Sequence, residues 1–198
     1  MRGKLAFAGI VALGLAELAL GAFAATTDVG PEYRAYYIDR TTGCLPREVP
    51  GTYALGTTVE PQSGKPRRAF DDILVCGFEN SIPEGTWLRG IEGRLRFTLD
   101  DGAPGDLVLR LDASARVTPS FRQQLTVFAN GQPVGIVTFD DKDPHQVEFL
   151  IRASARAAAS GRLDIALRMQ RLPHVEPTGK DSRLHSLLVG SIWLGPAD

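Results

Sequence analysis

The chain has 198 residues and almost balanced charge, with 22 basic and 23 acidic side chains. This length suffices for one domain with a well-formed core and is too short for two comfortable ones. A net charge of -1 gives no overall field that would attract nucleic acid, so no nucleic-acid partner is expected.

The N-terminus has the pattern of a secretory signal peptide. Arg2 and Lys4 precede an apolar run over residues 5–24 that ends in Ala-Phe-Ala, the small-x-small pattern of a cleavage site. We therefore expect residues 1–24 to be removed on export to the periplasm or the extracellular space. The alternative is an uncleaved membrane anchor, because the run approaches the roughly 20 residues that span a bilayer. Glu17 argues against it, since a carboxylate in hydrocarbon costs several kcal/mol.

Residues 25–70 carry little periodic pattern. They include an aromatic cluster, Tyr33, Tyr36 and Tyr37, whose rings could cover the core or meet a ligand. We expect this region to be an N-terminal extension packed on a domain that spans residues 71–198.

The two cysteines, Cys44 and Cys76, both lie in the exported part of the chain, where an oxidising compartment favours a disulfide. Such a bond would tie the extension to the domain and contribute roughly 3–4 kcal/mol in the chain-entropy model. The alternative is two separate buried thiols.

Beyond residue 70 the apolar residues alternate with polar ones, as in half-buried strands. A short apolar run, residues 73–75, leads to the second cysteine, and alternation follows over residues 94–99 and 106–113. The residues expected to face the core are Leu95, Phe97, Leu99, Leu107, Leu109, Leu111 and Ala113.

A β-hairpin is predicted over residues 123–139. Alternating residues stand on both sides of Asn130-Gly131, with Val134, Ile136 and Thr138 resuming the alternation in the second strand. Asn and Gly tolerate the positive φ that both central residues of a type I′ turn require.

Further strands are predicted over residues 145–151, 163–169 and 187–194, with Trp193 of the last strand placed in the core. The Ala-rich residues 152–160, closed by a glycine, indicate a short helix between two strands. Many short alternating strands and one short helical connection predict an all-β fold, an antiparallel β-sandwich.

Several segments, taken in order, resemble a bacterial jelly-roll domain of the galactose-binding-like kind. They are Gly77-Phe78, residues 83–87, residues 93–97, the hairpin with Asn130-Gly131 and Gly135, and residues 181–184. The resemblance is to a domain of unknown function, similar to the C-terminal domain of membrane-bound glycosyl or phosphoglycerol transferases. It implies a carbohydrate-binding-like module associated with the cell envelope. We expect no transferase within these 198 residues, which weakens the transfer of an envelope-synthesis role.

Trp87, Glu84 and Arg89 are the candidate carbohydrate-binding residues. An indole ring offers a flat apolar face for a sugar, and the two charged neighbours could bond hydroxyl groups. The alternative is that Trp87 caps the core and Glu84 orders its own loop.

Asp140, Asp141 and Asp143 are weak candidates for Ca²⁺, which prefers carboxylate oxygens from flexible loops. Aspartate is also common in turns because of its backbone hydrogen bonds, and the spacing matches no calcium motif. No metal or other cofactor is therefore expected.

Basic side chains are numerous before and within the first strands, and could attract anionic glycans or lipid headgroups or form a solvated face. They are Lys65, Arg67, Arg68, Arg89, Arg94 and Arg96. No motif for a nucleophile, metal or phosphate loop is present, so no catalytic residue is nominated. The favoured function is a non-catalytic module that binds carbohydrate. A structural or protein-interaction module, with an envelope protein as partner, is the alternative, and a glycosidase or esterase is less favoured.

Overall fold

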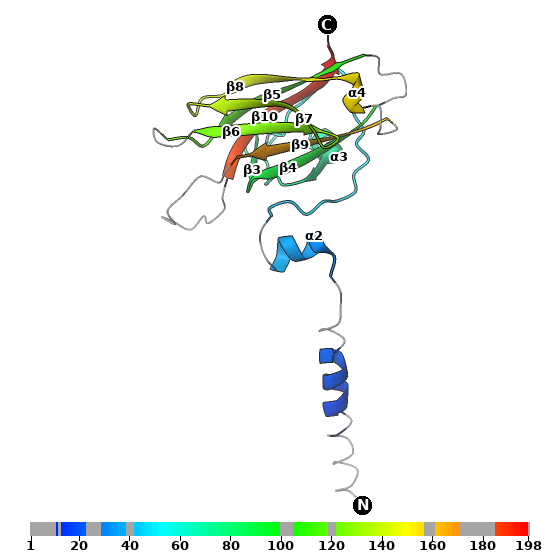
Figure 1. Cartoon of the computed structure of the whole chain (residues 1–198). Helices are drawn as coiled ribbons and strands as arrows, with labels where there is room; N and C mark the ends of the chain where they lie inside the picture. Colours follow the sequence, from blue (N-terminus) through cyan, green and yellow to red (C-terminus); the bar gives the residue numbers. More distant parts are fainter. Residues whose placement is uncertain are drawn as a thin grey trace, which may run out of the picture.

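The computed structural model describes residues 11, 13–22, 29–38, 42–99, 105–118, 122–156, 161–170 and 185–197. Two five-stranded sheets pack face to face (Figure 1). All pairings between their strands are antiparallel. The expected antiparallel β-sandwich is thereby confirmed.

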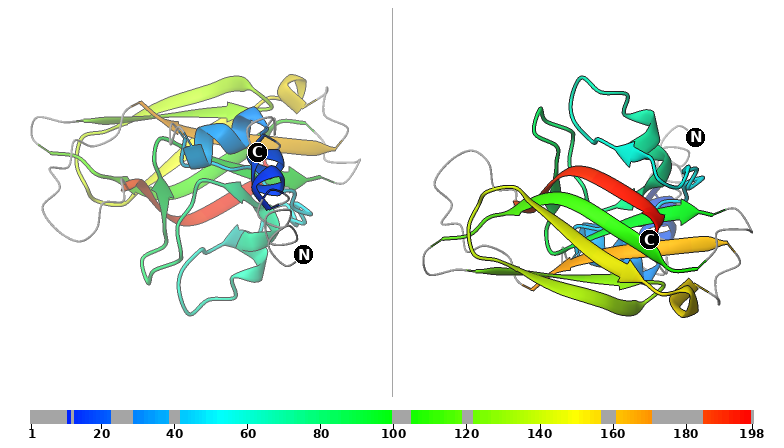
Figure 2. Two further views of the ribbon diagram at one scale, coloured as in Figure 1. Left: turned by 90° about the horizontal axis from the view of Figure 1, so that it is seen from below. Right: turned by 90° about the horizontal axis from the view of Figure 1, so that it is seen from above.

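Sheet 1 has the order β2-β4-β9-β6-β7, and sheet 2 has the order β1-β10-β5-β8 with β3 also paired to β10. Figure 2 shows the two layers, with the orange β9 in one and the red β10 in the other. The strands of sheet 1 are β2 (Leu74–Cys76), β4 (Glu92–Thr98), β9 (Arg162–Met169), β6 (Gln123–Ala129) and β7 (Gln132–Phe139). Those of sheet 2 are β1 (Thr58–Val59), β3 (Thr86–Arg89), β10 (His185–Pro196), β5 (Leu107–Ala115) and β8 (His145–Ile151).

The core lies between the sheets and is built by alternation along each strand. In β5, for example, Leu107, Leu109 and Leu111 are fully buried while Arg110 and Asp112 lie on the outer face. Strands β4, β8 and β9 alternate in the same way, as their sequences predict. Each fully buried leucine contributes about 1.5–3 kcal/mol, so this inward face supplies most of the stability of the fold.

The hairpin of β6 and β7 turns at Asn130 and Gly131, whose φ angles of 47° and 80° are those of the predicted type I′ turn. Its second strand differs from the expectation. A register shift after Val127 changes which residues of β7 face inward. Phe139 is buried, whereas Ile136 is 61% exposed.

Helices are few and short. The predicted helix is present as α4 (Ala153–Arg156), and residues 157–160 lie outside the described residues. A second helix, α3 (Arg68–Ile73), was not predicted. It buries Phe70 and Ile73, which are three residues apart and so share one helix face.

The segment before α3 runs along the sandwich. Thr52 forms a bridge with Thr98, and the Tyr53 ring packs edge-on against Phe97 with centroids 5.0 Å apart. Further towards the N-terminus are α2 (Pro31–Tyr33) and the π-helical turn η1 (Arg34–Ile38).

Residues 13–22 form helical backbone that stands apart from the sandwich in Figure 1. Within the described ranges, no helix combines the length and the apolar character needed to cross a bilayer.

Candidate functional site

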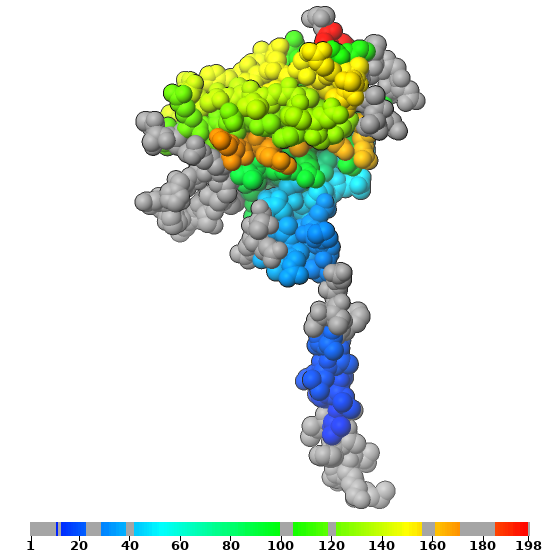
Figure 3. Space-filling view, viewed as in Figure 1, coloured from blue at the N-terminus to red at the C-terminus, as the bar shows by residue number. Residues whose placement is uncertain are grey.

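A groove of about 550 Å³ lies on the outer face of sheet 1, on the side where α2 approaches the sandwich. Strands β4 and β9 and the end of β6 provide most of its lining, and Glu32 and Glu48 line it from the N-terminal segment. Figure 3 shows the blue α2–η1 segment directly below the green and orange surface of β4 and β9. The volume is within the range of small-molecule sites.

The floor of the groove is a row of three residues paired across the sheet. Arg94 in β4 pairs with Ala166 in β9, which pairs in turn with Phe128 in β6. Directly paired residues place their side chains on the same face, about 5 Å apart. The Ala166 methyl therefore leaves a hollow between the Phe128 ring and the Arg94 side chain.

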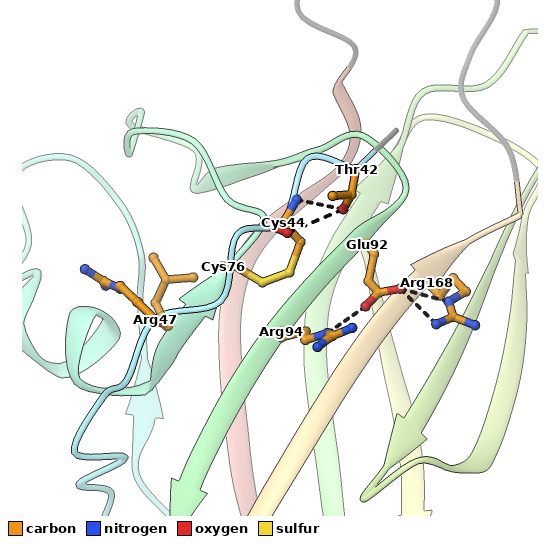
Figure 4. Close-up of a disulfide and its surroundings, with 8 residues drawn as sticks. Thr42, Cys44, Arg47, Cys76, Glu92, Arg94 and Arg168 are labelled. Atoms are coloured by element: carbon orange, nitrogen blue, oxygen red, sulfur yellow. Dashed lines mark hydrogen bonds and ion pairs between the residues drawn. A yellow bond between two sulfur atoms is a disulfide. The ribbon is translucent and has the colours of Figure 1, made fainter. Parts of the chain in front are cut away.

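Glu92 joins two arginines at one end of the groove (Figure 4). Arg94 Nε donates to Glu92 Oε1 at 2.6 Å, and Arg168 Nη2 donates to Oε2 at 2.9 Å. Burial alone would raise the pKa of the Glu92 carboxyl, but the hydrogen bonds and charges of Arg94 and Arg168 bring this pKa below its ordinary value. Glu92 is thus an anion at neutral pH. The Arg168 guanidinium that it binds lies over the Phe128 ring, 5.0 Å from the ring centroid.

Arg96 is the centre of a second charged cluster, at the other end of the groove. Its Nε donates to Asp164 Oδ1 at 2.7 Å, and its Nη1 donates to Glu48 Oε2 at 2.8 Å. The hydrogen bond to Asp164, together with the charges of Asp164 and Glu48, raises the pKa of Arg96. Asn130 Oδ1 accepts from the Asp164 backbone N–H at 2.8 Å, so the hairpin turn also fixes this cluster.

The disulfide between Cys44 and Cys76 is present, as expected, and attaches the N-terminal segment to β2 beside the groove (Figure 4). Thr42 Oγ1 accepts from the Cys44 backbone N–H at 3.0 Å. Arg47 Nε donates to the Leu74 carbonyl oxygen at 2.9 Å. These contacts fix the position of the adjacent Glu48 at the groove.

Trp87 lies on the outer face of sheet 2, away from the groove, and is half-buried. Its ring stacks on His185, with centroids 5.3 Å apart and planes 11° apart, and the Arg116 guanidinium lies 5.1 Å from the ring centroid. Arg89 follows on the same strand and forms a 3.5 Å ion pair with a glutamate of the preceding loop. Glu84 is exposed in the turn before β3. The structure thus places Trp87 and Arg89 on one strand, whereas Glu84 belongs to a separate turn.

Trp193 was predicted in the core, and this was wrong. Its neighbours Ile192 and Leu194 are fully buried, so alternation places the Trp193 ring on the outer face of sheet 2. There its Nε1 donates to the Gly56 carbonyl oxygen at 2.9 Å, and the Arg110 guanidinium lies 4.3 Å from the ring centroid.

The aspartates considered for Ca²⁺ have other partners. Asp141 Oδ1 accepts from the Asp143 backbone N–H at 3.0 Å and contacts His145 Nε2 at 2.7 Å. The His145 bond, followed by that from Asp143, lowers the pKa of Asp141. Asp140 pairs with Arg122 at 3.2 Å. Across the described ranges, no three histidine, cysteine or acidic side chains gather in a way that could hold a metal.

Most of the basic side chains considered for anionic ligands are paired with carboxylates. Lys65 pairs with Glu60 at 3.2 Å and Arg67 with Asp71 at 3.0 Å, and the arginines of β4 are paired in the groove. The segment 181–184, quoted for the resemblance, lies outside the described residues.

Sequence reasoning did not identify the groove. Glu92, Phe128, Asp164, Ala166 and Arg168 belong to three strands that are far apart in the sequence. A detectable signal exists on two of these strands, because outward arginines in β4 and outward charges of both signs in β9 alternate with core residues. The register that joins them into pairs comes only from the folded sheet.

No family model matches the chain, and no curated protein matches it significantly. Among solved structures, the chain is similar to a CBM36 carbohydrate-binding module in complex with calcium and xylotriose, at 15% identity and a TM-score of 0.36. That match covers 70% of this chain and 99% of the module.

Two further similarities are to the EclA C-terminal domain, a sugar-binding protein, and to an exo-β-1,3-galactanase from Phanerochaete chrysosporium. The first has 8% identity and a TM-score of 0.39, covering 72% of this chain and 79% of that one. The second has 16% identity and a TM-score of 0.37, covering 71% of this chain and 29% of the galactanase. Because the identities and TM-scores of these matches are low, they do not indicate what the chain binds. Any functional conclusion therefore rests on the groove itself.

Proposed function

We propose that the chain is an exported, non-catalytic module that binds carbohydrate in the groove on sheet 1. The observation that carries the proposal is the row formed by Arg94, Ala166 and Phe128. It combines a flat aromatic side chain, a hollow one side chain wide, and a guanidinium whose Nε is fixed by Glu92.

This arrangement suits a pyranose ring. The apolar C–H face of a sugar packs on an aromatic ring, and its hydroxyls bond charged planar side chains at the ring edge. Phe128 provides the ring, one face of which the Arg168 guanidinium covers, and Arg94 and Asp164 lie on the side of the Ala166 hollow. Their ion pairs hold them in place before a ligand arrives, which reduces the conformational entropy that binding would cost.

Two carboxylates of the groove, Glu92 and Asp164, are poorly suited to act as the general acid of hydrolysis. A glycosidase needs one carboxyl group that keeps its proton near neutral pH. Glu92 has the opposite property, because two arginines lower its pKa, and Asp164 is held by Arg96. The groove therefore supports recognition of a ligand rather than its cleavage.

Export is the second part of the proposal. A Cys44–Cys76 disulfide persists in an oxidising compartment, which supports the interpretation of residues 1–24 as a cleaved signal and the periplasm or the exterior as the location. Association with envelope polysaccharide belongs to the same proposal. Mass spectrometry of the protein recovered from the culture or periplasm tests it, with Ala25 as the expected first residue and an intact Met1 as the contradicting result.

Binding is tested with the mature chain, residues 25–198, on a glycan array and then by calorimetry. Ala166→Phe fills the hollow without removing a charge, and we expect it to weaken binding at least tenfold. Leu150→Phe is the matched control, because it places an aromatic ring on the outer face of sheet 2, where Leu150 is 43% exposed. Unchanged affinity in Ala166→Phe, with thermal unfolding as in the wild type, would overturn the assignment to the groove.

Trp87→Ala tests the other proposed location. Loss of sugar binding in Trp87→Ala, with binding retained in Ala166→Phe, would move the site to the outer face of sheet 2 and bring in Arg89 and Glu84 as its polar groups. Because the Trp87 ring is already stacked on His185, we expect this variant to affect stability more than binding.

A protein-interaction module is the second candidate, favoured by the N-terminal aromatic cluster. Tyr33, Tyr37 and Ile38 are 48%, 52% and 54% exposed, and the Tyr33 and Tyr37 rings pack together with centroids 4.6 Å apart. Two results together would favour this function. No glycan on the array would bind the mature chain, and the chain would capture an envelope protein that the Tyr33→Ser/Tyr37→Ser variant fails to capture.

A further inference from the structure

The charges that line the groove are almost balanced, with one negative charge in excess. Four carboxylates and three guanidiniums face it. Every one of these guanidiniums donates to a carboxylate. The lining residues with charge are Glu32, Glu48, Glu92, Asp164, Arg94, Arg96 and Arg168.

Each guanidinium that lines the groove is already paired with a carboxylate, so none is available to an anionic ligand as an unpaired cation. To bind a uronate or phosphate group, Arg94 or Arg168 would have to leave Glu92, or the anion would have to lie next to that carboxylate. Either alternative costs free energy, because it separates a close ion pair or places like charges together. The Glu92 side chain is only 15% exposed, so water screens this repulsion incompletely.

A hydroxyl group has neither difficulty. It can accept from a terminal Arg94 nitrogen and donate to a Glu92 or Asp164 oxygen without breaking an existing pair. In the described part of the chain, Arg94 bonds through its Nε alone, which leaves both Nη groups directed to solvent or ligand. Two neighbouring hydroxyls on a sugar match an arginine beside a carboxylate.

We propose that the groove selects uncharged glycans and discriminates against acidic ones, and that Glu92 is the residue that sets this specificity. The inference rests on the proposed function and specifies its ligand class.

The experiment compares matched pairs of ligands. Each neutral hexopyranose oligosaccharide on the array is paired with its C6-oxidised derivative, in which every CH₂OH has become a carboxylate and the linkage is unchanged. We expect the neutral member to bind the mature chain at least tenfold more tightly. Its Kd should change less than twofold between 50 and 500 mM NaCl, because no net charge is neutralised on binding.

Glu92→Gln removes the anion that compensates Arg94 and Arg168. We expect this variant to bind the oxidised member at least fivefold more tightly than the wild type does. Glu148→Gln is the matched control, because Glu148 pairs with Arg110 at 2.6 Å on the outer face of sheet 2 and its loss changes the net charge equally. We expect it to change neither affinity by more than twofold.

The outcomes separate the two proposals. Equal or tighter binding of the oxidised member by the wild type overturns the inference and leaves carbohydrate binding intact. An equal gain in Glu148→Gln and Glu92→Gln also overturns it, because net charge rather than Glu92 would then set specificity. If neither member of any ligand pair binds, the proposed function is overturned, and the inference with it.

Discussion

Replacing both Cys44 and Cys76 by serine removes the bond that attaches the N-terminal segment to β2. The cysteines are 32 residues apart in the sequence, and for a closed loop of that length the chain-entropy model gives roughly 3–4 kcal/mol. For a domain of this size, 1 kcal/mol shifts the Tm by about 2–4 °C, so the expected decrease is roughly 6–16 °C. The double replacement leaves no unpaired thiol to react with other chains.

Urea unfolding of the mature chain, followed by tryptophan fluorescence, measures this effect. We expect a lower midpoint and a larger m-value, because an unfolded chain without the cross-link exposes more surface. Thr42→Val is the control. It leaves the disulfide in place and removes the two hydrogen bonds of the Thr42 hydroxyl, which accepts from the Cys44 backbone N–H and donates to the Cys44 carbonyl oxygen and contributes about 1 kcal/mol. A double variant within 1 kcal/mol of the wild type would refute the reasoning that the bond acts through the unfolded chain.

Two further predictions concern the groove and its supporting backbone. Glu92→Gln should lower the free energy of unfolding by about 1 kcal/mol at pH 7. Because the folded pKa of Glu92 is lowered, this contribution is complete above the ordinary value of about 4.5 and is lost as pH falls through the folded pKa. Urea unfolding of both proteins from pH 7 to pH 3 checks it, and a difference that persists undiminished at pH 3 contradicts it. Gly77→Ala should destabilise by more than about 3 kcal/mol, since a Cβ there would collide with the Glu92 carbonyl oxygen in addition to the strain of φ +88°. Gly131→Ala, with φ +80° and open space around it, should cost only about 1 kcal/mol in the same assay, and similar costs for both would contradict this reasoning.

The sequence predicted the strands well where one face of a strand meets the core. Leu95 and Phe97 in β4, and Leu163 and Ile165 in β9, are buried as their alternation indicates. A two-residue period leaves no other arrangement that buries these side chains together. The Asn130-Gly131 turn was also predicted, because its positive φ angles demand a particular pair of residues.

The errors have local physical causes. The phase of β7 changes at a register shift, and nothing in the local alternation around Ile136 signals an extra residue. Trp193 was assigned to the core because it lies in the final strand, although its flanking residues Ile192 and Leu194 occupy the core positions there. The helix α3 is too short for a helical period to be distinguished from an irregular segment.

The groove could not be predicted because its defining property is a set of pairings. Arg96 and Asp164 are 68 positions apart in the sequence, and each alone is typical of a solvated strand face. The hollow at Ala166 exists only because longer side chains in β4 and β6 stand beside it.

A titration of the ¹⁵N-labelled mature chain by NMR, with the neutral glycan that binds most tightly on the array, tests the central claim most directly. We predict saturable shifts in the backbone amides of Arg94, Ala166 and Phe128 and of their neighbours on β4, β9 and β6. Shifts confined to β3 and β10 around Trp87, or no saturable shift with any array glycan, would contradict the claim that the groove on sheet 1 binds carbohydrate.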